Sequence, residues 1–240
     1  MLHKLLRGAA AAALVAAATG AQAGVFGVAP LKLELGGKVR TAVITVTNEG
    51  AEPLQIEVNP VAWTTAEDGS EKYSPTEDLA VYPPGLNVPP GQKRVVRVGI
   101  DGDGGPVEKT YRVFLKEVEN ANAGRPRGAQ VSMLVNFGVP VFVSARPTRA
   151  ELQATTGVAS GELRLQVHNA GDGRTRIDGI TLGGLPRTYP SPYVLAGATR
   201  VLHFTVGKED CARGRMQELQ LRLQDDSVIK LNADLAEACR

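Results

Sequence analysis

The chain has 240 residues, with 27 Lys and Arg against 25 Asp and Glu, and its formal net charge is +2. This near balance gives no support for nucleic acid binding or for a polybasic membrane-binding surface. The length is sufficient for two domains of ordinary size.

The first 23 residues have the pattern of a secretory signal peptide. Lys4 and Arg7 precede an Ala-rich apolar stretch, which ends in the A-x-A cleavage pattern AQA at residues 21–23. The apolar run, residues 8–18, is too short to span a bilayer, and no later stretch reaches the ~20 residues that a spanning helix needs. We therefore expect residues 1–23 to be removed and the rest to be exported without membrane insertion. Loss of the two basic residues leaves 25 basic against 25 acidic residues.

The next part of the chain is a series of short segments in which apolar and polar residues alternate, separated by turn residues. Alternation at a period of two indicates β-strands. About seven such strands over about 120 residues, with turn signals between them, is the pattern of an immunoglobulin-like sandwich. The segments are residues 27–35, 40–48, 54–63, 79–92, 94–100, 110–118 and 131–143.

The second half of the chain has the same pattern of short alternating segments separated by turn residues. Its expected strands lie within residues 161–173, 175–184, 192–207 and 216–235. Each half has an early strand that ends in an Asn-x-Gly turn, at Thr45–Gly50 and at Val167–Gly171. We therefore predict an all-β fold of two tandem immunoglobulin-like β-sandwich domains, residues 24–147 and 148–240.

The segment from residue 131 to residue 143 is the most unusual strand in the chain. A strand this long, apolar and uncharged invites pairing with another chain if it is exposed. Pro140 lacks an N–H group for the ladder, so it belongs at an edge or a bulge. The pattern predicts an adhesive edge strand, whose odd positions are all apolar: Val131, Met133, Val135, Phe137, Val139, Val141 and Val143.

The chain has two cysteines, Cys211 and Cys239. In an exported protein two thiols are expected to pair with each other. The alternative is a metal site, but two cysteines without a nearby histidine do not make a zinc site. We therefore predict a Cys211–Cys239 disulfide.

Residues with catalytic potential are scarce. His168 and His203 alternate with apolar residues inside expected strands, and no nucleophile, zinc, P-loop or dinucleotide-binding motif occurs. The DGDGG segment at 101–105 lacks the spacing of a calcium loop. Asp225 and Asp226 are adjacent, which places them on opposite faces of a strand. We predict a protein that is not an enzyme and that has no cofactor and no metal site.

Several segments together resemble the periplasmic pilus (fimbrial) chaperones of the chaperone–usher pathway, and the C-terminal cysteine pair is closer to the archaic, spore-coat-like branch. The resemblance covers nearly the whole exported chain and implies two domains in a boomerang arrangement. It also implies periplasmic localisation, with pilus subunits (pilins) and an outer-membrane usher as partners. The matching segments are APLKLEL (29–35), ITVTNEG (44–50), VPPGQKRVVRV (88–98), TYRVFLKEV (110–118), GVPVFVSARP (138–147), LGGL (182–185) and LQDD (223–226).

In this family the seventh strand of the first domain is lent to an incomplete pilin, which is an example of strand addition. The resemblance implies that one face of this strand supplies the apolar anchors. On the odd face these are Met133, Val135, Phe137 and Val139. The alternative is that the odd face points into the protein's own core, with Leu134 and Phe142 facing the pilin.

The family also anchors the C-terminal carboxylate of the subunit with two basic residues in the cleft between the domains. Lys32 matches the first of these, which is usually an arginine. The second normally lies on the seventh strand, but nothing in 131–145 is basic, so we expect Arg97 to replace it.

The resemblance further implies an ionic set that fixes the angle between the domains. Glu117, Arg146 and Asp225 match this set, with Asp226 as a rival of Asp225. The resemblance leaves open whether the free protein covers its strand by self-association. An alternative function is a secreted immunoglobulin-like structural or adhesive subunit of a surface fibre, but a subunit should be one incomplete domain.

Overall fold

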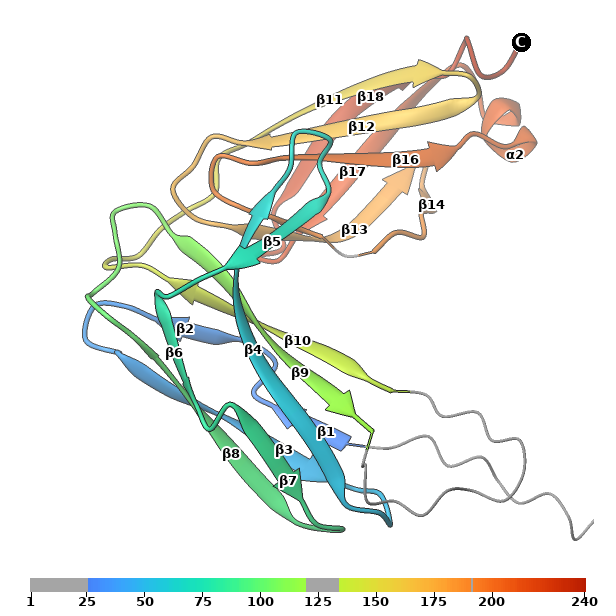
Figure 1. Cartoon of the computed structure of the whole chain (residues 1–240). Helices are drawn as coiled ribbons and strands as arrows, with labels where there is room; N and C mark the ends of the chain where they lie inside the picture. The colour runs from blue at the N-terminus through green and yellow to red at the C-terminus, as the bar shows by residue number, and fades with distance from the viewer. Residues whose placement is uncertain (1–25, 120–133, 191) are drawn as a thin grey trace, which may run out of the picture.

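The computed structural model describes residues 26–119, 134–190 and 192–240. The predicted signal peptide, residues 1–23, lies outside these ranges. The described chain is almost entirely β-structure and forms two sandwiches set at an angle to each other (Figure 1). Strands β1 to β10 build the first sandwich and β11 to β18 the second, and the chain passes between them after Val143 and before Leu152.

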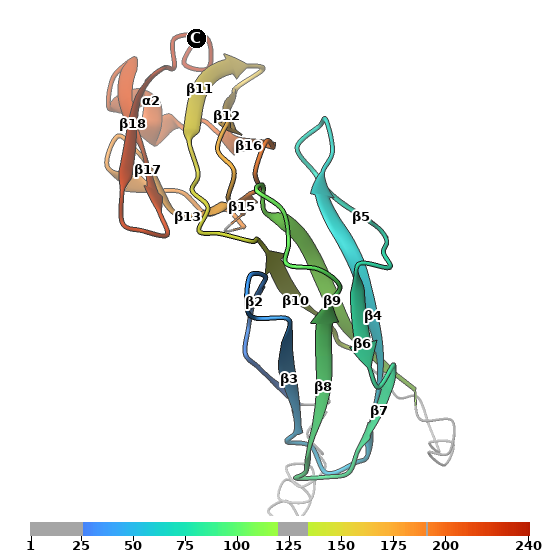
Figure 2. The ribbon, with the colours of Figure 1, turned by 90° about the vertical axis from the view of Figure 1, so that its left-hand side faces the viewer.

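The first sandwich packs a four-stranded sheet, in the order β1-β3-β8-β6, against a six-stranded sheet, in the order β2-β10-β9-β4-β5 with β7 added to β4. Strands β10, β9 and β4 of the larger sheet lie side by side (Figure 2). The strands are β1 (Phe26–Ala29), β2 (Leu33–Leu35), β3 (Thr41–Asn48), β4 (Leu54–Thr65), β5 (Glu71–Pro75), β6 (Leu79–Tyr82), β7 (Gly85–Val88), β8 (Lys93–Ile100), β9 (Lys109–Val118) and β10 (Asn136–Val143).

Alternation along these strands builds the core between the two sheets. In β9, for example, Tyr111, Val113 and Leu115 are buried while the residues between them are not. Successive side chains of a strand point to opposite faces, so each strand contributes every second residue to the core. The sequence alternation thus correctly indicated both the strands and the sandwich.

Over residues 26–119 and 134–143 the first sandwich has ten strands, three more than predicted. The expected strand 27–35 is divided at Pro30 into β1 and β2, and the expected strand 79–92 is divided at Pro83 and Pro84 into β6 and β7. A proline cannot donate to a ladder, and in both places the chain moves from one sheet to the other. The third addition, β5, is exposed throughout and has little apolar alternation.

The second sandwich packs the sheet β11-β12-β16 against the sheet β14-β13-β17-β18, with β15 paired to β13. The predicted disulfide is confirmed: Cys211 in α2 is bonded to Cys239, with their Cα atoms 5.5 Å apart. The elements are β11 (Leu152–Ala159), β12 (Glu162–Asn169), β13 (Thr175–Leu182), β14 (Leu185–Pro186), β15 (Tyr193–Val194), β16 (Thr199–Thr205), α2 (Lys208–Ala212), β17 (Met216–Leu223) and β18 (Val228–Asp234).

Both predicted Asn-x-Gly turns are present, and the two asparagine side chains make equivalent hydrogen bonds to the backbone. Asn48 ends β3, is buried, and its amide donates to the carbonyl oxygens of Glu52 and Val88. Its side-chain oxygen accepts the N–H of Gly50. Asn169 ends β12 in the same way and is described further below. Each asparagine satisfies backbone groups that a turn would otherwise leave buried without partners.

Candidate functional site

Strand β10 has a partly unpaired edge. It pairs with β9 along its full length, but with β2 only through Val141–Val143. Within the described residues, no strand pairs with the outer edge of β10 over residues 136–140. Of the predicted edge strand 131–143, the part over residues 136–143 is present as β10, with one end covered and the other end free, and residues 131–133 lie outside the described residues.

The backbone groups on this free edge belong to even-numbered residues. The N–H of Glu117 donates to the carbonyl oxygen of Val135 at 2.8 Å. Residues of an antiparallel pair alternate between those that exchange hydrogen bonds with the partner strand and those that do not. Val135, Phe137 and Val139 therefore direct their backbone groups at β9. Even-numbered residues direct theirs outward, and Pro140 occupies such a position, so its missing N–H costs the β9 ladder nothing.

The odd-numbered side chains of β10 point into the protein's own sandwich. Val139 has no exposed surface, and Val141 and Val143 are also buried in the core of the first sandwich. The expectation that Val139 faces outward as an anchor is therefore wrong, because this side chain already fills the core. Burial decreases toward the free end, where Phe137 packs partly against the core and Val135 is half-buried. Met133 lies outside the described residues.

The alternative donor face, with Leu134 and Phe142, is also only partly exposed. Leu134 is 45% exposed, but Phe142 is 2% exposed. Phe142 packs with Trp63 of β4 and with Tyr193 and Leu195 of the second sandwich. This aromatic cluster is the apolar contact between the two sandwiches. Phe142 thus belongs to the domain interface and is not available to a partner.

The outer face of the same sheet carries basic residues beside β10. Lys32 precedes β2, and its ammonium contacts Glu34 at 3.0 Å. Arg112 of β9 pairs with Pro140 across the ladder and lies between two buried residues, so it is on the outer face. Its guanidinium lies 4.1 Å from the centre of the Trp63 ring, a cation–π contact. Lys32 and Arg112 thus flank β10 near its free half.

Arg97, the expected second basic residue, lies elsewhere. It belongs to β8 in the smaller sheet, where its neighbours Val96 and Val98 are buried, so Arg97 points outward from the opposite side of the sandwich. The structure does not bring it to Lys32. Arg112, which pairs with Pro140 across the ladder, lies on the same face as Lys32. The alternation around Arg112 indicated its outward direction, but the strand order was needed to place it beside β10.

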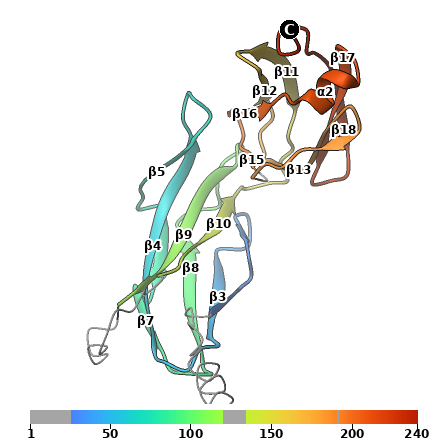
Figure 3. The same cartoon turned by 90° about the vertical axis from the view of Figure 1, so that its right-hand side faces the viewer.

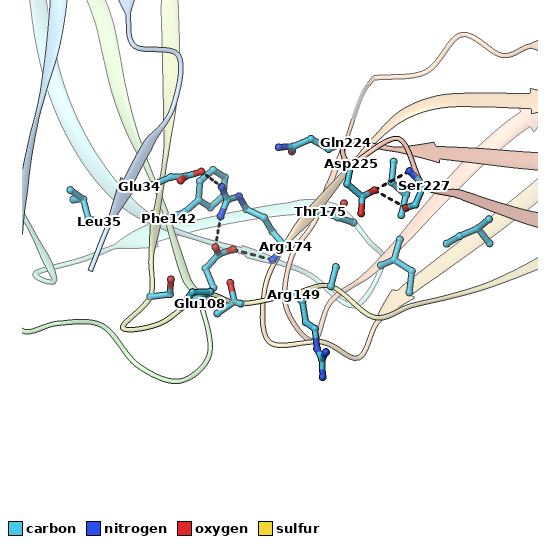
Figure 4. Close-up of a pocket in the computed structure, with 17 residues that line it drawn as sticks. Glu34, Leu35, Glu108, Phe142, Arg149, Arg174, Thr175, Gln224, Asp225 and Ser227 are labelled. Carbon is cyan, nitrogen blue, oxygen red and sulfur yellow. Dashed lines mark hydrogen bonds and ion pairs between the residues drawn. The ribbon is translucent and has the colours of Figure 1, made fainter. Parts of the chain in front are cut away.

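The ionic contacts between the sandwiches centre on two arginines, Arg174 and Arg200. Arg174 is 13% exposed and contacts the carboxylates of Glu108 and Glu34, the latter at 2.6 Å (Figure 4). Its guanidinium also lies 3.4 Å from the centre of the Phe142 ring. The side chain of Arg174 therefore covers the edge of the aromatic cluster, and its positive charge is paired with two carboxylates.

Arg200 makes the second set of contacts. It donates to the carbonyl oxygens of Gly69 and Tyr193 and contacts Glu71 at 3.0 Å. Gly69 and Glu71 belong to the β4–β5 hairpin, which extends beyond the first sandwich toward β16 (Figure 3). A side chain at Gly69 would meet the backbone of Val201 at 2.8 Å. The hairpin tip is thus fitted closely against the second sandwich.

The predicted ionic set of Glu117, Arg146 and Asp225 is not formed. Glu117 accepts the N–H of Val135 at the far end of β9, Arg146 pairs with Asp172, and Asp225 accepts hydrogen bonds from Ser227. Asp226, the rival of Asp225, pairs with Arg222 within the second sandwich. The sequence order of charges could not reveal which of them the fold brings to the interface. The residues that fill this position are Glu34, Glu71, Glu108, Arg174 and Arg200.

Two glutamates at the domain interface, Glu34 and Glu71, each contact two cationic side chains, and both ionise readily. Hydrogen bonding from Lys32 and the charge of Arg174, opposed by partial burial, hold the pKa of Glu34 below its usual range. Burial raises the pKa of Glu71, but its hydrogen bond from Tyr73 and the charges of Arg112 and Arg200 outweigh burial, so this pKa is also lowered. Both ion pairs are therefore fully charged at neutral pH.

The family of the chain follows from a direct comparison. Residues 26–150 match the model of the pili and flagellar-assembly chaperones, PapD N-terminal domain. The chain therefore belongs to this family, and the resemblance seen in the sequence is confirmed. The family and the fold are those of non-enzymatic pilus chaperones. No curated protein matches the chain significantly. None of the helices within residues 26–119, 134–190 and 192–240 is long and apolar enough to cross a membrane.

Solved structures of low sequence identity share the fold. One is the CsuC–CsuE chaperone–tip adhesion subunit complex from archaic chaperone–usher Csu pili of Acinetobacter baumannii, with 14% identity and a TM-score of 0.66, covering 87% of this chain and 98% of that one. Another is the Salmonella enterica SafA pilin in complex with the SafB chaperone, with 16% identity, a TM-score of 0.59 and coverages of 90% and 99%. The E. coli chaperone DraB has 16% identity, a TM-score of 0.57 and coverages of 90% and 98%. The two-domain immunoglobulin-like fold is thereby confirmed.

Proposed function

We propose that this protein is a periplasmic chaperone that caps pilus subunits along the free edge of β10 and delivers them to an outer-membrane usher. The observation that carries the proposal is the division of β10. Its second half is buried in the core and paired with β2, while among the described residues no strand pairs with the outward backbone groups of Asn136 and Gly138. An edge of this kind accepts an added strand.

Val135 and Phe137, together with Met133 from the sequence, are the proposed apolar anchors. The side chains of Val135 and Phe137 lie on the same side as the core residues of β10 but toward its open end. A subunit strand added at this edge would place the open core of the subunit next to that of the chaperone. Full burial of one such side chain contributes roughly 1.5–3 kcal/mol, and these two are already half-buried, so each adds part of that amount.

Lys32 and Arg112 are the proposed anchor for the terminal carboxylate of the subunit. They flank β10 on either side: Arg112 lies in β9 and Lys32 directly precedes β2, and three adjacent strands span about 10 Å. A carboxylate placed over Pro140 would lie between two cations. Arg112 offers a planar fork for bidentate pairing, and Lys32 offers a flexible point charge. Arg112 thus takes the role that we had expected of Arg97.

Co-expression in the periplasm with fibre subunits encoded near the chaperone gene tests the donor edge. Phe137→Ser and Val135→Asn should each lower the yield of the complex about tenfold or more, because they lose apolar burial and place a polar group in the groove. Leu134→Ser is the matched control, since Leu134 lies on the opposite face and is exposed. If all three variants capture subunits like the unmodified protein, the donor-edge proposal is wrong.

A further inference from the structure

The two basic side chains that we assign to the subunit carboxylate already hold carboxylates of this chain. The ammonium nitrogen of Lys32 lies 3.0 Å from Oε1 of Glu34. The guanidinium of Arg112 lies 2.9 Å from Oε2 of Glu71. Tyr73 adds a hydrogen bond to Glu71 and also accepts one from Arg112. Neither cation is therefore left as an open anion site.

Each of these two carboxylates is also held by an arginine of the second sandwich. Glu34 contacts Arg174 at 2.6 Å, and Glu71 contacts Arg200 at 3.0 Å. The result is two parallel sets of three charges. In both sets a glutamate lies between a cation of the proposed anchor and an arginine of the domain interface.

In the set that contains Glu34, the two cations are held with different firmness, whereas in the set that contains Glu71 both Arg112 and Arg200 are mostly buried. Arg174 also contacts Glu108 and stacks on Phe142, and Arg200 also donates to two backbone carbonyl oxygens. Lys32, in contrast, has a side chain that is 46% exposed and has Glu34 as its one ion-pair partner among the described residues. A half-exposed ion pair of this kind is weak and exchanges easily. An incoming carboxylate would displace the glutamate from Lys32 more readily than from Arg174.

We infer that Glu34 and Glu71 are positioning residues that act as internal substitutes for the subunit carboxylate, and this rests on the proposed function. They neutralise Lys32 and Arg112 in the free protein and stay with Arg174 and Arg200 when the subunit arrives. The cleft then holds little attraction for small anions or acidic proteins. A carboxylate that is carried by a strand already paired with β10 has a high effective concentration and can displace them.

Binding of synthetic peptides to the full-length exported chain tests this inference. The probe copies the final strand of the subunit that co-purifies with the chaperone, and it is made with a free C-terminal carboxylate and as the C-terminal amide. Glu34→Gln and Glu71→Gln should each tighten binding of the acid peptide about two- to fivefold. They should leave the amide peptide unchanged. Glu218→Gln, which removes a carboxylate paired with Lys230 in the second sandwich, is the matched control.

Three other outcomes overturn the inference in distinguishable ways. If the glutamine variants weaken the acid peptide, or change both peptides equally, the two glutamates only support the structure. If the unmodified protein prefers the acid peptide but the variants do not increase that preference, the inference is wrong and the carboxylate anchor stands. If the unmodified protein binds both peptides alike, the carboxylate anchor itself is wrong, and the inference falls with it.

Discussion

The side chain of Asn169 is hydrogen-bonded to five backbone groups near the domain junction. Its amide donates to the carbonyl oxygens of Gly173, Val194 and Leu195, at 2.8, 3.0 and 3.1 Å. Its side-chain oxygen accepts the N–H groups of Glu151 and Gly171. The residue has no exposed surface. It therefore connects the start of β11, the β12–β13 turn and the β15–β16 loop.

Asn169→Ala should lower the free energy of unfolding by about 2–3 kcal/mol, because buried groups lose their partners. Urea unfolding followed by far-UV circular dichroism measures this. Asn232→Ala is the matched control, since Asn232 is an exposed residue of the same sandwich, and it should change stability by less than ~0.5 kcal/mol. Equal effects of the two substitutions would contradict the role assigned to Asn169.

At the scale of one element, β10 combines a core strand with an edge strand. Val139 is fully buried, whereas Leu134 is 45% exposed. Val139→Ala removes two methyl groups from the core and should cost roughly 1–3 kcal/mol of stability. Leu134→Ala should cost less than ~0.5 kcal/mol. Thermal melting of the free protein separates the two, and a small effect of Val139→Ala would mean that this side chain faces outward after all.

The sequence alone could not decide which face of β10 is which. Its odd positions are all apolar, but Leu134, Pro140 and Phe142 make the even face apolar as well. The reason is now clear: the odd face fills the first core, and Phe142 fills the domain interface. In β9, by contrast, the buried residues Tyr111, Val113 and Leu115 alternate with residues that are not buried, among them Arg112.

The sequence was even less able to predict which charged residues the fold brings together. The Cys211–Cys239 bond was predictable because two cysteines leave one possible pair. Arg97 and Arg112 both lie between buried residues in alternating strands, and nothing local distinguishes them. Their assignment to different sheets depends on strand order, which is a property of the whole chain. For this reason Glu108, Arg174 and Arg200 were missed.

At the scale of the whole molecule, the domain interface should be sensitive to acid. The pKa values of Glu34 and Glu71 are lowered in the folded protein. Their ion pairs with Arg174 and Arg200 therefore contribute stability above the ordinary carboxyl pKa, about 4.3. That contribution is lost as the pH falls through the lower folded values. Below about pH 4 we expect the two sandwiches to separate before either unfolds.

Trp63 provides the measurement, because it is the single tryptophan of the chain and lies in the interface cluster. Its emission should shift to the red on acidification while far-UV circular dichroism remains unchanged. The double variant Glu34→Gln, Glu71→Gln should show a smaller pH dependence of this shift. An emission change that coincides with loss of β-structure would instead mean that the interface and the sandwiches fail together.

The described part of the free edge of β10 also limits the binding free energy that backbone hydrogen bonds can supply. Among the described residues of β10, Asn136 and Gly138 each offer one outward N–H and one outward carbonyl oxygen, and each hydrogen bond is worth about 0.5–1.5 kcal/mol net. Four of them give roughly 2–6 kcal/mol, which reaches only the lower part of the 4–15 kcal/mol that association itself costs. An unrelated protein that offers only a strand edge would therefore not stay bound. The hydrogen bonds of this described part of the edge alone do not retain a partner. A subunit stays bound only if it also supplies an empty apolar groove for the anchor side chains.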